Sequence, residues 1–217
     1  MNNYEKFFQL HHQKEPFIIA NAWNAKSAQI IENNEYDAIA TSSANIPLSV
    51  DLERGYADNL AELNDNIQKL IDIGVVGINL EDAQGEEINL KKLNSIKNYL
   101  TKNNQKLFIN ARTDGFLQKL ESPLERTLKR AKLYEDAGAD GLFVTGVQDI
   151  ALIKEITSSV TLPVNVAGVP KLSSIEALAK CGVRRISMAV FLYKATYNQL
   201  EKVVRDIKTE QSFAPLY

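Results

Sequence analysis

The sequence has little that would place it outside the cell interior or in a membrane. Its 217 residues include one cysteine, Cys181, which cannot form an internal disulfide and so fits a reducing compartment. No apolar run approaches the roughly 20 residues of a membrane span. The first residues, 1–6, are polar and lack the charged-then-apolar layout of a signal peptide. We therefore expect a cytoplasmic protein.

A strong net charge is also missing. The formal charge is −2 and the pI is about 5.8, which argues against a nucleic-acid or anionic-membrane surface as partner. Hydrophobic residues make up 45% and charged residues 24%, as is ordinary for a globular protein. The length allows one domain, 1–217, with a full core.

Short apolar segments alternate with amphipathic helical segments along most of the chain. Amphipathic spacing is clear over 60–73, and glycines at Gly74, Gly138 and Gly182 each separate a helix pattern from a strand pattern. Regular alternation predicts parallel strands covered by helices. Eight strands favour an α/β (β/α)8 TIM barrel, with a flavodoxin-like open sheet as the alternative. The expected strands begin near Phe17, Asp37, Leu48, Val76, Leu107, Asp140, Leu162 and Arg184.

One connection is too short for this pattern. Only residues 42–47 separate the second and third expected strands, whereas a parallel crossover ordinarily needs a dozen residues or more. Either these two strands are not parallel neighbours, or a helical unit is absent or disordered near Ala44 and Asn45. We favour the absent unit, because a barrel lacking a unit would expose sheet edges.

The segment 49–56 carries the strongest chemical signal. Asp51 and Glu53 follow an apolar strand one residue apart, and side chains at i and i+2 of a strand share a face. Two converging carboxylates suit a hard cation such as Mg²⁺ (or Mn²⁺). Two further strands end in the same manner, at 79–82 with Glu81 and Asp82, and at 110–114 with Arg112 and Asp114. The alternatives are capping of the following helix and pairing with Arg54.

Other polar residues are expected at the same ends of the strands. Arg112 offers a planar donor fork for a substrate carboxylate, or forms a buried ion pair with Asp114 or Glu81. Ser42 and Ser43 either clasp a carboxylate or form a plain turn. Asn165 either binds the substrate or only supports residues that do. Trp23 either lines the pocket or packs at the rim or against another subunit.

Taken together, these motifs resemble the isocitrate lyase/phosphoenolpyruvate mutase superfamily over nearly the whole chain. The resemblance implies a barrel whose last helix is swapped between subunits, a homo-oligomer (dimer or tetramer), and Mg²⁺-dependent cleavage or formation of C–C or P–C bonds. It implies that Asp51 touches the metal, that Glu53 and Glu81 hold it through water, and that Arg112 contacts the substrate beside the group that is cleaved. The matching motifs are 19–24, 40–44, 49–56, 77–82, 110–114 and 163–166.

Two departures from that family leave the reaction open. The lyase branches carry a cysteine in the loop after the fourth strand, but residues 82–87 here contain neither cysteine nor histidine. The P–C branches use an aspartate after the second strand, in the segment that is too short here. We therefore expect a lyase or decarboxylase of a small 2-oxo or 2-hydroxy acid, oxaloacetate-like, with an enolpyruvate-type intermediate. The alternatives are P–C chemistry on phosphonopyruvate, and a non-catalytic barrel that binds a dicarboxylate.

Overall fold

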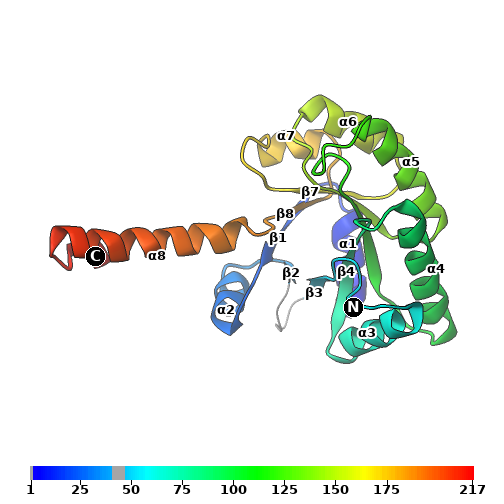
Figure 1. Ribbon diagram of the computed structural model, residues 1–217, viewed down its shortest axis with the longest axis horizontal. Helices are drawn as coiled ribbons and strands as arrows, with labels where there is room; N and C mark the ends of the chain where they lie inside the picture. The colour runs from blue at the N-terminus through cyan, green and yellow to red at the C-terminus, as the bar shows by residue number, and fades with distance from the viewer. Residues whose placement is uncertain (1, 41–46) are drawn as a thin grey trace.

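The structure is a computed structural model that describes residues 2–40 and 47–217. Eight parallel strands close into a barrel in chain order, β1 to β8, with β8 paired to β1 (Figure 1). The strands are β1 Phe17–Asn21, β2 Ile39–Ala40, β3 Leu48–Asp51, β4 Val75–Glu81, β5 Phe108–Thr113, β6 Gly141–Val144, β7 Val164–Ala167 and β8 Arg185–Ser187. This confirms the expected α/β (β/α)8 barrel and excludes the open sheet.

The helices form the outer layer, apart from α1 and α8. They are α1 Asn3–His12, α2 Ala25–Asn33, α3 Leu60–Asp72, α4 Glu86–Lys102, α5 Pro123–Asp136, α6 Ile150–Ser159, α7 Ile175–Lys180 and α8 Phe191–Glu210, with a 3₁₀ turn η1 at Ala214–Leu216. Side chains at Asn24, Asn59 and Ser174 accept backbone N–H groups of the first turns. None of these helices, in the part of the chain that is described, is long and apolar enough to cross a membrane.

The structure contradicts one alternative for the short connection between β2 and β3, namely that the two strands are not parallel neighbours. The two strands are parallel neighbours, with Ile39 opposite Leu48 and Ala40 opposite Ser49. Because β2 has only two residues, the chain leaving Ala40 has to return only about one strand spacing, roughly 5 Å, to reach Leu48. Seven residues are long enough to span that distance. The expected absent unit near Ala44 and Asn45 falls on residues 41–46, outside the described residues.

Helix α1 closes the N-terminal mouth of the barrel. Phe7 is fully buried and packs edge-on against Phe17 and Phe108, with ring centroids 6.1 and 5.5 Å apart. His11 stacks on Phe108 at 4.0 Å. A Cβ at Gly77 would lie 2.5 Å from the Phe7 ring, so a glycine is required where α1 meets β4. This end of the barrel is an aromatic plug.

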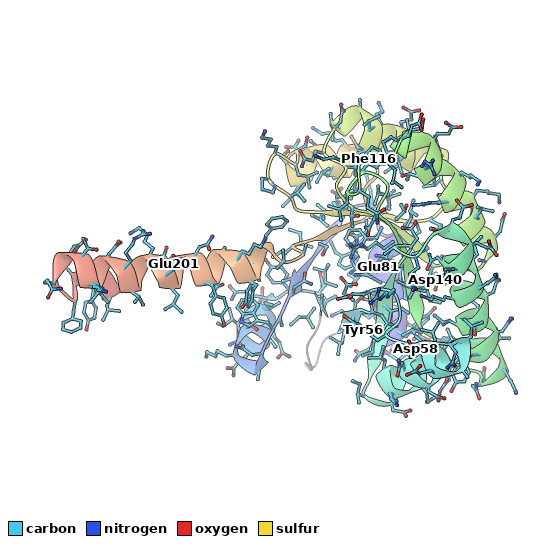
Figure 2. All side chains as sticks on the ribbon, viewed as in Figure 1. Tyr56, Asp58, Glu81, Phe116, Asp140 and Glu201 are labelled. Carbon is cyan, nitrogen blue, oxygen red and sulfur yellow. The ribbon has the colours of Figure 1, made fainter. Side chains whose placement is uncertain are left out.

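Helix α8 is different from the other helices because it leaves the barrel. It projects as a long arm (Figure 1), and none of its residues is buried. Glu201 lies about halfway along this arm, with side chains protruding on both sides of the ribbon (Figure 2). Its exposed apolar residues include Tyr197, Leu200 and Val204. An apolar helix face of this kind is ordinarily covered by other protein in the functional assembly.

Candidate active site

The C-terminal ends of the strands open into a pocket of about 790 Å³. Polar side chains from six strands or their ends line its floor: Asn21, Asp51, Asn79, Arg112, Thr145 and Ser187. Its wall is apolar, with Trp23, Leu117, Val169 and Phe191 among the lining residues. A concave pocket with a few convergent polar groups, at this end of a barrel, is where such folds carry out chemistry.

Arg112 is the centre of the charged cluster. Its Nη1 lies 3.1 Å from Glu81 Oε2 and 3.6 Å from Asp51 Oδ2. Its Nε and Nη2 donate to the two oxygens of Asp114 at 2.8 and 3.1 Å. Glu81, at the end of β4, lies at the centre of the barrel region in Figure 2. The predicted acids and arginine therefore meet at one mouth of the barrel, and the predicted ion pairs with Asp114 and Glu81 are also present.

Asp114 is fixed in turn by its neighbours. It is 4% exposed, accepts a short hydrogen bond from the Thr145 hydroxyl, and its own N–H donates to Asp82 at 3.2 Å. Asp82 is buried and accepts from Tyr134 at 2.7 Å and from Arg130 at 2.8 Å. The guanidinium plane of Arg112 is thus oriented by a chain of buried groups rather than by solvent.

The geometry of Asp51 and Glu53 differs from the strand alternation expected above. β3 ends at Asp51, and Glu53 follows in a turn with a left-handed φ of 46°. The Glu53 N–H donates to Asp51 Oδ1 at 3.3 Å. The prediction that strand alternation brings the two carboxylates together was therefore wrong, because the turn that leads to Gly55 begins one residue after Asp51. The turn, and not the strand, keeps Asp51 and Glu53 adjacent.

The electrostatics of the acids reflect crowding. Burial raises the pKa of the Asp51 carboxyl above its ordinary 3.8, although Arg112 opposes the change. Burial also raises the pKa of Glu81 above 4.5, and the charges of Asp114, Asp51 and Glu53 add to it. A hydrogen bond to Glu53 raises the pKa of the exposed Tyr56 to about 12. Negative charge is therefore in excess at this mouth, which favours a cation there.

The donor set fits a hydrated divalent cation. Asp51, Glu53 and Glu81 offer only oxygen ligands, which Mg²⁺ and Mn²⁺ prefer. Among residues 2–40 and 47–217, however, no three His, Cys, Asp or Glu side chains lie close enough together to hold one ion directly. Arg112 Nη1 lies between Asp51 and Glu81. A cation bound here would thus be held partly through water, as Mg²⁺ commonly is.

Lys92 links two loops of the site. From α4 its Nζ donates to the carbonyl of Arg54 at 2.6 Å and to Gln84 Oε1 at 2.5 Å. Arg54 lies in the loop after β3 and Gln84 in the loop after β4. Burial and the charge of Arg54 lower the pKa of Lys92. This contact holds together the loops that follow Asp51 and Glu81.

The other predicted residues have different positions. Trp23 lines the pocket and packs edge-on against Tyr193 of α8, with ring centroids 5.5 Å apart. Asn165 is fully buried on β7 and is not among the pocket-lining residues. Ser42 and Ser43 lie outside the described residues. The substrate-binding roles of these residues stay predictions.

Some lining residues were missed by sequence reasoning. Asn79 precedes Glu81 by two residues and Thr145 follows the last residue of β6. Strand periodicity would have placed Asn79 on the inward face with Glu81. Thr145 has no acidic or basic neighbour two residues away, so no charge pattern marks it, and the arginine two residues before Ser187, Arg185, was not interpreted as part of the site.

Comparison with known proteins agrees with the barrel and its site. A family profile described as phosphoenolpyruvate phosphomutase matches residues 7–46 and 43–208. The chain therefore belongs to this family, whose relatives include lyases and mutases, and the resemblance found in the sequence is confirmed. The match divides where the connection between β2 and β3 is short.

Two relatives illustrate the range of the family. An uncharacterized protein of Mycobacterium tuberculosis is 33% identical over 219 residues, covering 87% of this chain and 83% of the relative. An oxaloacetate decarboxylase of Pseudomonas fluorescens is 29% identical over 174 residues, covering 72% of this chain but 58% of that enzyme. The match thus spans less than two thirds of the length of the decarboxylase.

Solved structures share the architecture closely. A protein from Burkholderia cenocepacia described provisionally as a phosphonomutase is 29% identical, with a TM-score of 0.87 over 94% of this chain and 99% of that one. Oxaloacetate acetylhydrolase with the inhibitor 3,3-difluorooxalacetate has a TM-score of 0.86 over 98% of this chain and 88% of that one. At 14% identity the second likeness shows the fold alone.

Proposed function

We propose that this protein is a lyase that breaks a bond beside the 2-oxo group of a small carboxylic acid and depends on Mg²⁺ or Mn²⁺. Decarboxylation of an oxaloacetate-like acid is the reaction that the site supports best. The observation that carries this proposal is the position of Arg112, which is 3.1 Å from Glu81 and 3.6 Å from Asp51 at the floor of the pocket.

Arg112 has the donors to hold a substrate carboxylate. A guanidinium has five N–H donors, and contacts with Asp114 and Glu81 use three of them. Of the other two, one belongs to Nη1, which also lies 3.6 Å from Asp51, and one belongs to Nη2 and is available to a ligand. Because Asp114 fixes the guanidinium plane, a carboxylate bound there is oriented without a large entropic cost.

The acids provide the counterpart of Arg112. Asp51 would contact a divalent cation, with Glu53 and Glu81 holding its water shell. When bound, the cation supplies a Lewis acid for the 2-oxo group of the substrate. In an oxaloacetate-like substrate the C3–C4 bond breaks, its electron pair forms the enolate of pyruvate, CO₂ leaves, and C3 then takes a proton from water.

The composition of the site favours decarboxylation over other family reactions. The loop after β4, residues 82–87, has no cysteine or histidine that could act as acid or base. Decarboxylation of a 2-oxo acid that carries a second carboxylate on C3 does not need one, because loss of CO₂ leaves the electron pair in an enolate and solvent can supply the proton. The relation to oxaloacetate decarboxylases points to the same substrate class.

The test is release of pyruvate from oxaloacetate, measured with Mg²⁺, with Mn²⁺ and with EDTA, against a blank with the same metal and no protein. We expect turnover above the blank with either metal and none with EDTA. Turnover that is unchanged by EDTA would overturn the metal requirement. Binding of oxalate without turnover of any tested acid would indicate the non-catalytic barrel.

P–C chemistry is the second candidate, favoured by the family profile and by the phosphonomutase-like structure. It predicts that phosphonopyruvate is converted with release of phosphate or with formation of phosphoenolpyruvate. Phosphonopyruvate and oxaloacetate should therefore be assayed side by side at equal concentration. A higher kcat/KM for phosphonopyruvate would replace decarboxylation as the leading function.

We further propose that the protein is a homo-oligomer in which α8 packs against another copy. The exposed apolar residues of α8 and the Trp23–Tyr193–Tyr197 cluster beside the pocket support this assembly. Light scattering is expected to give the mass of a dimer or tetramer. A monomer at micromolar concentration would contradict it.

A further inference from the structure

The interior of the barrel below the pocket is unusually polar. Barrel interiors are ordinarily filled by layers of branched apolar side chains. Here the inward residues one step below the pocket floor include Ser49 on β3, Asn110 on β5, Asn165 on β7 and Arg185 on β8. Each lies two residues before a pocket-lining residue of its own strand, namely Asp51, Arg112, Ala167 and Ser187.

Polar atoms of all four side chains lack hydrogen-bond partners among residues 2–40 and 47–217. These atoms are Ser49 Oγ, Asn110 Oδ1, both side-chain polar atoms of Asn165, and all three guanidinium nitrogens of Arg185. Arg185 and Asn165 lie opposite each other on the paired strands β8 and β7, so their side chains point to the same side of the sheet. A buried polar atom without a partner is expensive, and a charged one more so. Four such groups in one interior indicate bound water rather than an empty space.

Arg185 cannot reach solvent through the bottom of the barrel. Its guanidinium carbon lies 5.9 Å from the centre of the Phe7 ring, which belongs to the aromatic plug. Burial lowers the pKa of Arg185 to about 10, so the group stays charged at neutral pH. Among the acids, Asp51 is the one whose charge favours the ionised guanidinium. The charge of Arg185 therefore acts upward, toward the floor of the pocket.

We propose that Arg185 organises a cluster of ordered water molecules in the barrel interior, with Asn165, Asn110 and Ser49, and that it is a positioning residue for the acidic site above it. Through this hydrated layer, its positive charge opposes that of a cation at Asp51 and favours an anionic ligand. This effect on cation and anion rests on the proposed metal site, whereas the water cluster does not.

A crystal structure at a resolution where buried water is visible, about 1.5 Å, tests the first half. We expect at least two waters within hydrogen-bond distance of the Arg185 guanidinium, with Asn165 or Ser49 as further partners. A dry interior, direct side-chain contacts to every guanidinium nitrogen, or a bound halide in place of water would overturn the cluster.

Binding measurements on Arg185→Met and Arg185→Lys test the second half, with Mn²⁺ alone and with oxalate in the presence of Mn²⁺. At an effective dielectric constant of about 20, a unit charge about 12 Å from a monovalent ion changes its binding constant by about tenfold. Arg185→Met is thus expected to bind Mn²⁺ about 3- to 10-fold more tightly and oxalate about 3- to 10-fold more weakly. Arg185→Lys should remain close to the wild type in both.

Opposite changes separate this role from simple damage, because a distorted barrel would bind both ligands more weakly. Arg184→Met is the matched control: the neighbouring side chain points away from the interior and donates to the Lys14 carbonyl, and its loss removes the same charge. It should leave both affinities unchanged. Equal weakening of Mn²⁺ and oxalate in Arg185→Met, or no change in either, would overturn the positioning role. If Arg185→Met does not fold, Arg185→Gln is measured in its place.

If the wild type binds no Mn²⁺, the proposed metal-dependent function fails. The crystal structure still shows whether the water cluster exists.

Discussion

The two ends of the barrel are built from opposite kinds of residue. The N-terminal mouth is closed by α1, where Phe7, Phe17, Phe108 and His11 pack ring against ring. The C-terminal mouth holds Asp51, Glu81, Asp114 and Arg112 within one network. Both ends are largely buried, but one buries apolar rings and the other buries charge.

The two ends of the barrel therefore contribute to stability with opposite signs. Packed rings stabilise the fold, since burial of a large aromatic side chain contributes a few kcal/mol. Crowded carboxylates oppose folding, and burial raises the pKa values of Asp51 and Glu81 because their ionised forms are disfavoured. The comparison predicts that substitutions at the bottom change stability and that substitutions at the top change function.

The largest effect is expected at the aromatic plug. Phe7→Ala removes a fully buried ring that touches Phe17, Phe108 and the space above Gly77. We expect the free energy of unfolding to fall by about 3–5 kcal/mol, the range for Phe→Ala in a core. Chemical denaturation measures it. Phe8→Ala, one residue on and only partly buried, is the control and should cost clearly less.

The same variant also tests the comparison itself. Under conditions where Phe7→Ala is folded, its kcat/KM should remain within a few-fold of the wild type. A large loss of turnover in the folded variant would mean that the two ends are coupled, and the division between stability and function would not hold.

The next largest effect is expected at Asp51. Asp51→Ala removes the carboxylate proposed to contact the cation, so metal-dependent turnover should fall by about 10²–10³-fold. The variant should be as stable as the wild type or more stable, because a carboxylate with an unfavourable environment is lost. The control is Asp136→Ala, a surface acid paired with Lys132. Unchanged turnover in Asp51→Ala would remove the metal assignment.

The fold could be predicted from the sequence because its signals are repeated. Eight apolar segments, and glycines such as Gly74 and Gly138 after helices, all indicated the same alternation, and both glycines have positive φ in the structure. The exception was β2. Two residues carry no periodicity, so their pattern could not show that β2 has only two residues and pairs directly with β3.

The site was predicted only in part, for a physical reason. Charges mark Asp51, Glu81 and Arg112 in the sequence, and these residues do converge. Arg185 also carries a charge, but its sequence neighbours 184–187 do not distinguish an inward from an outward arginine. The sequence did not decide whether Asp114 pairs with Arg112, because their bidentate contact depends on the turn after β5.

A smaller effect is expected when the orientation of Arg112 is disturbed. Asp114→Asn keeps the shape of the side chain but removes the charge that pairs with Nε and Nη2 of Arg112. We expect kcat/KM to fall by about 10- to 100-fold through misplacement of the guanidinium. Mn²⁺ affinity should fall by much less than kcat/KM, because Asp114 is not among the proposed ligands and only its charge acts on the cation. Equal losses in Mn²⁺ affinity and in kcat/KM would instead indicate a collapse of the whole cluster.

The smallest effect is a shift in the pH dependence of cation binding. A proton and a cation compete for the same carboxylate, and the pKa values of Asp51 and Glu81 lie above 3.8 and 4.5, respectively. Mn²⁺ affinity should therefore begin to fall at a higher pH than for an ordinary exposed carboxyl, by at most about tenfold per pH unit for each proton taken up. The stability of the fold depends on pH in the opposite direction. These acids bind protons more tightly in the folded than in the unfolded state, so their contribution to the free energy of unfolding decreases as pH rises through the folded pKa values. Titrations with Mn²⁺ between pH 8 and pH 4, repeated on Glu81→Gln, measure the affinity, and chemical denaturation over the same range measures the stability. In Glu81→Gln the fall should move toward the pH of Asp51 alone, and an affinity that stays flat to about pH 4 in the wild type would show that neither carboxylate holds the ion.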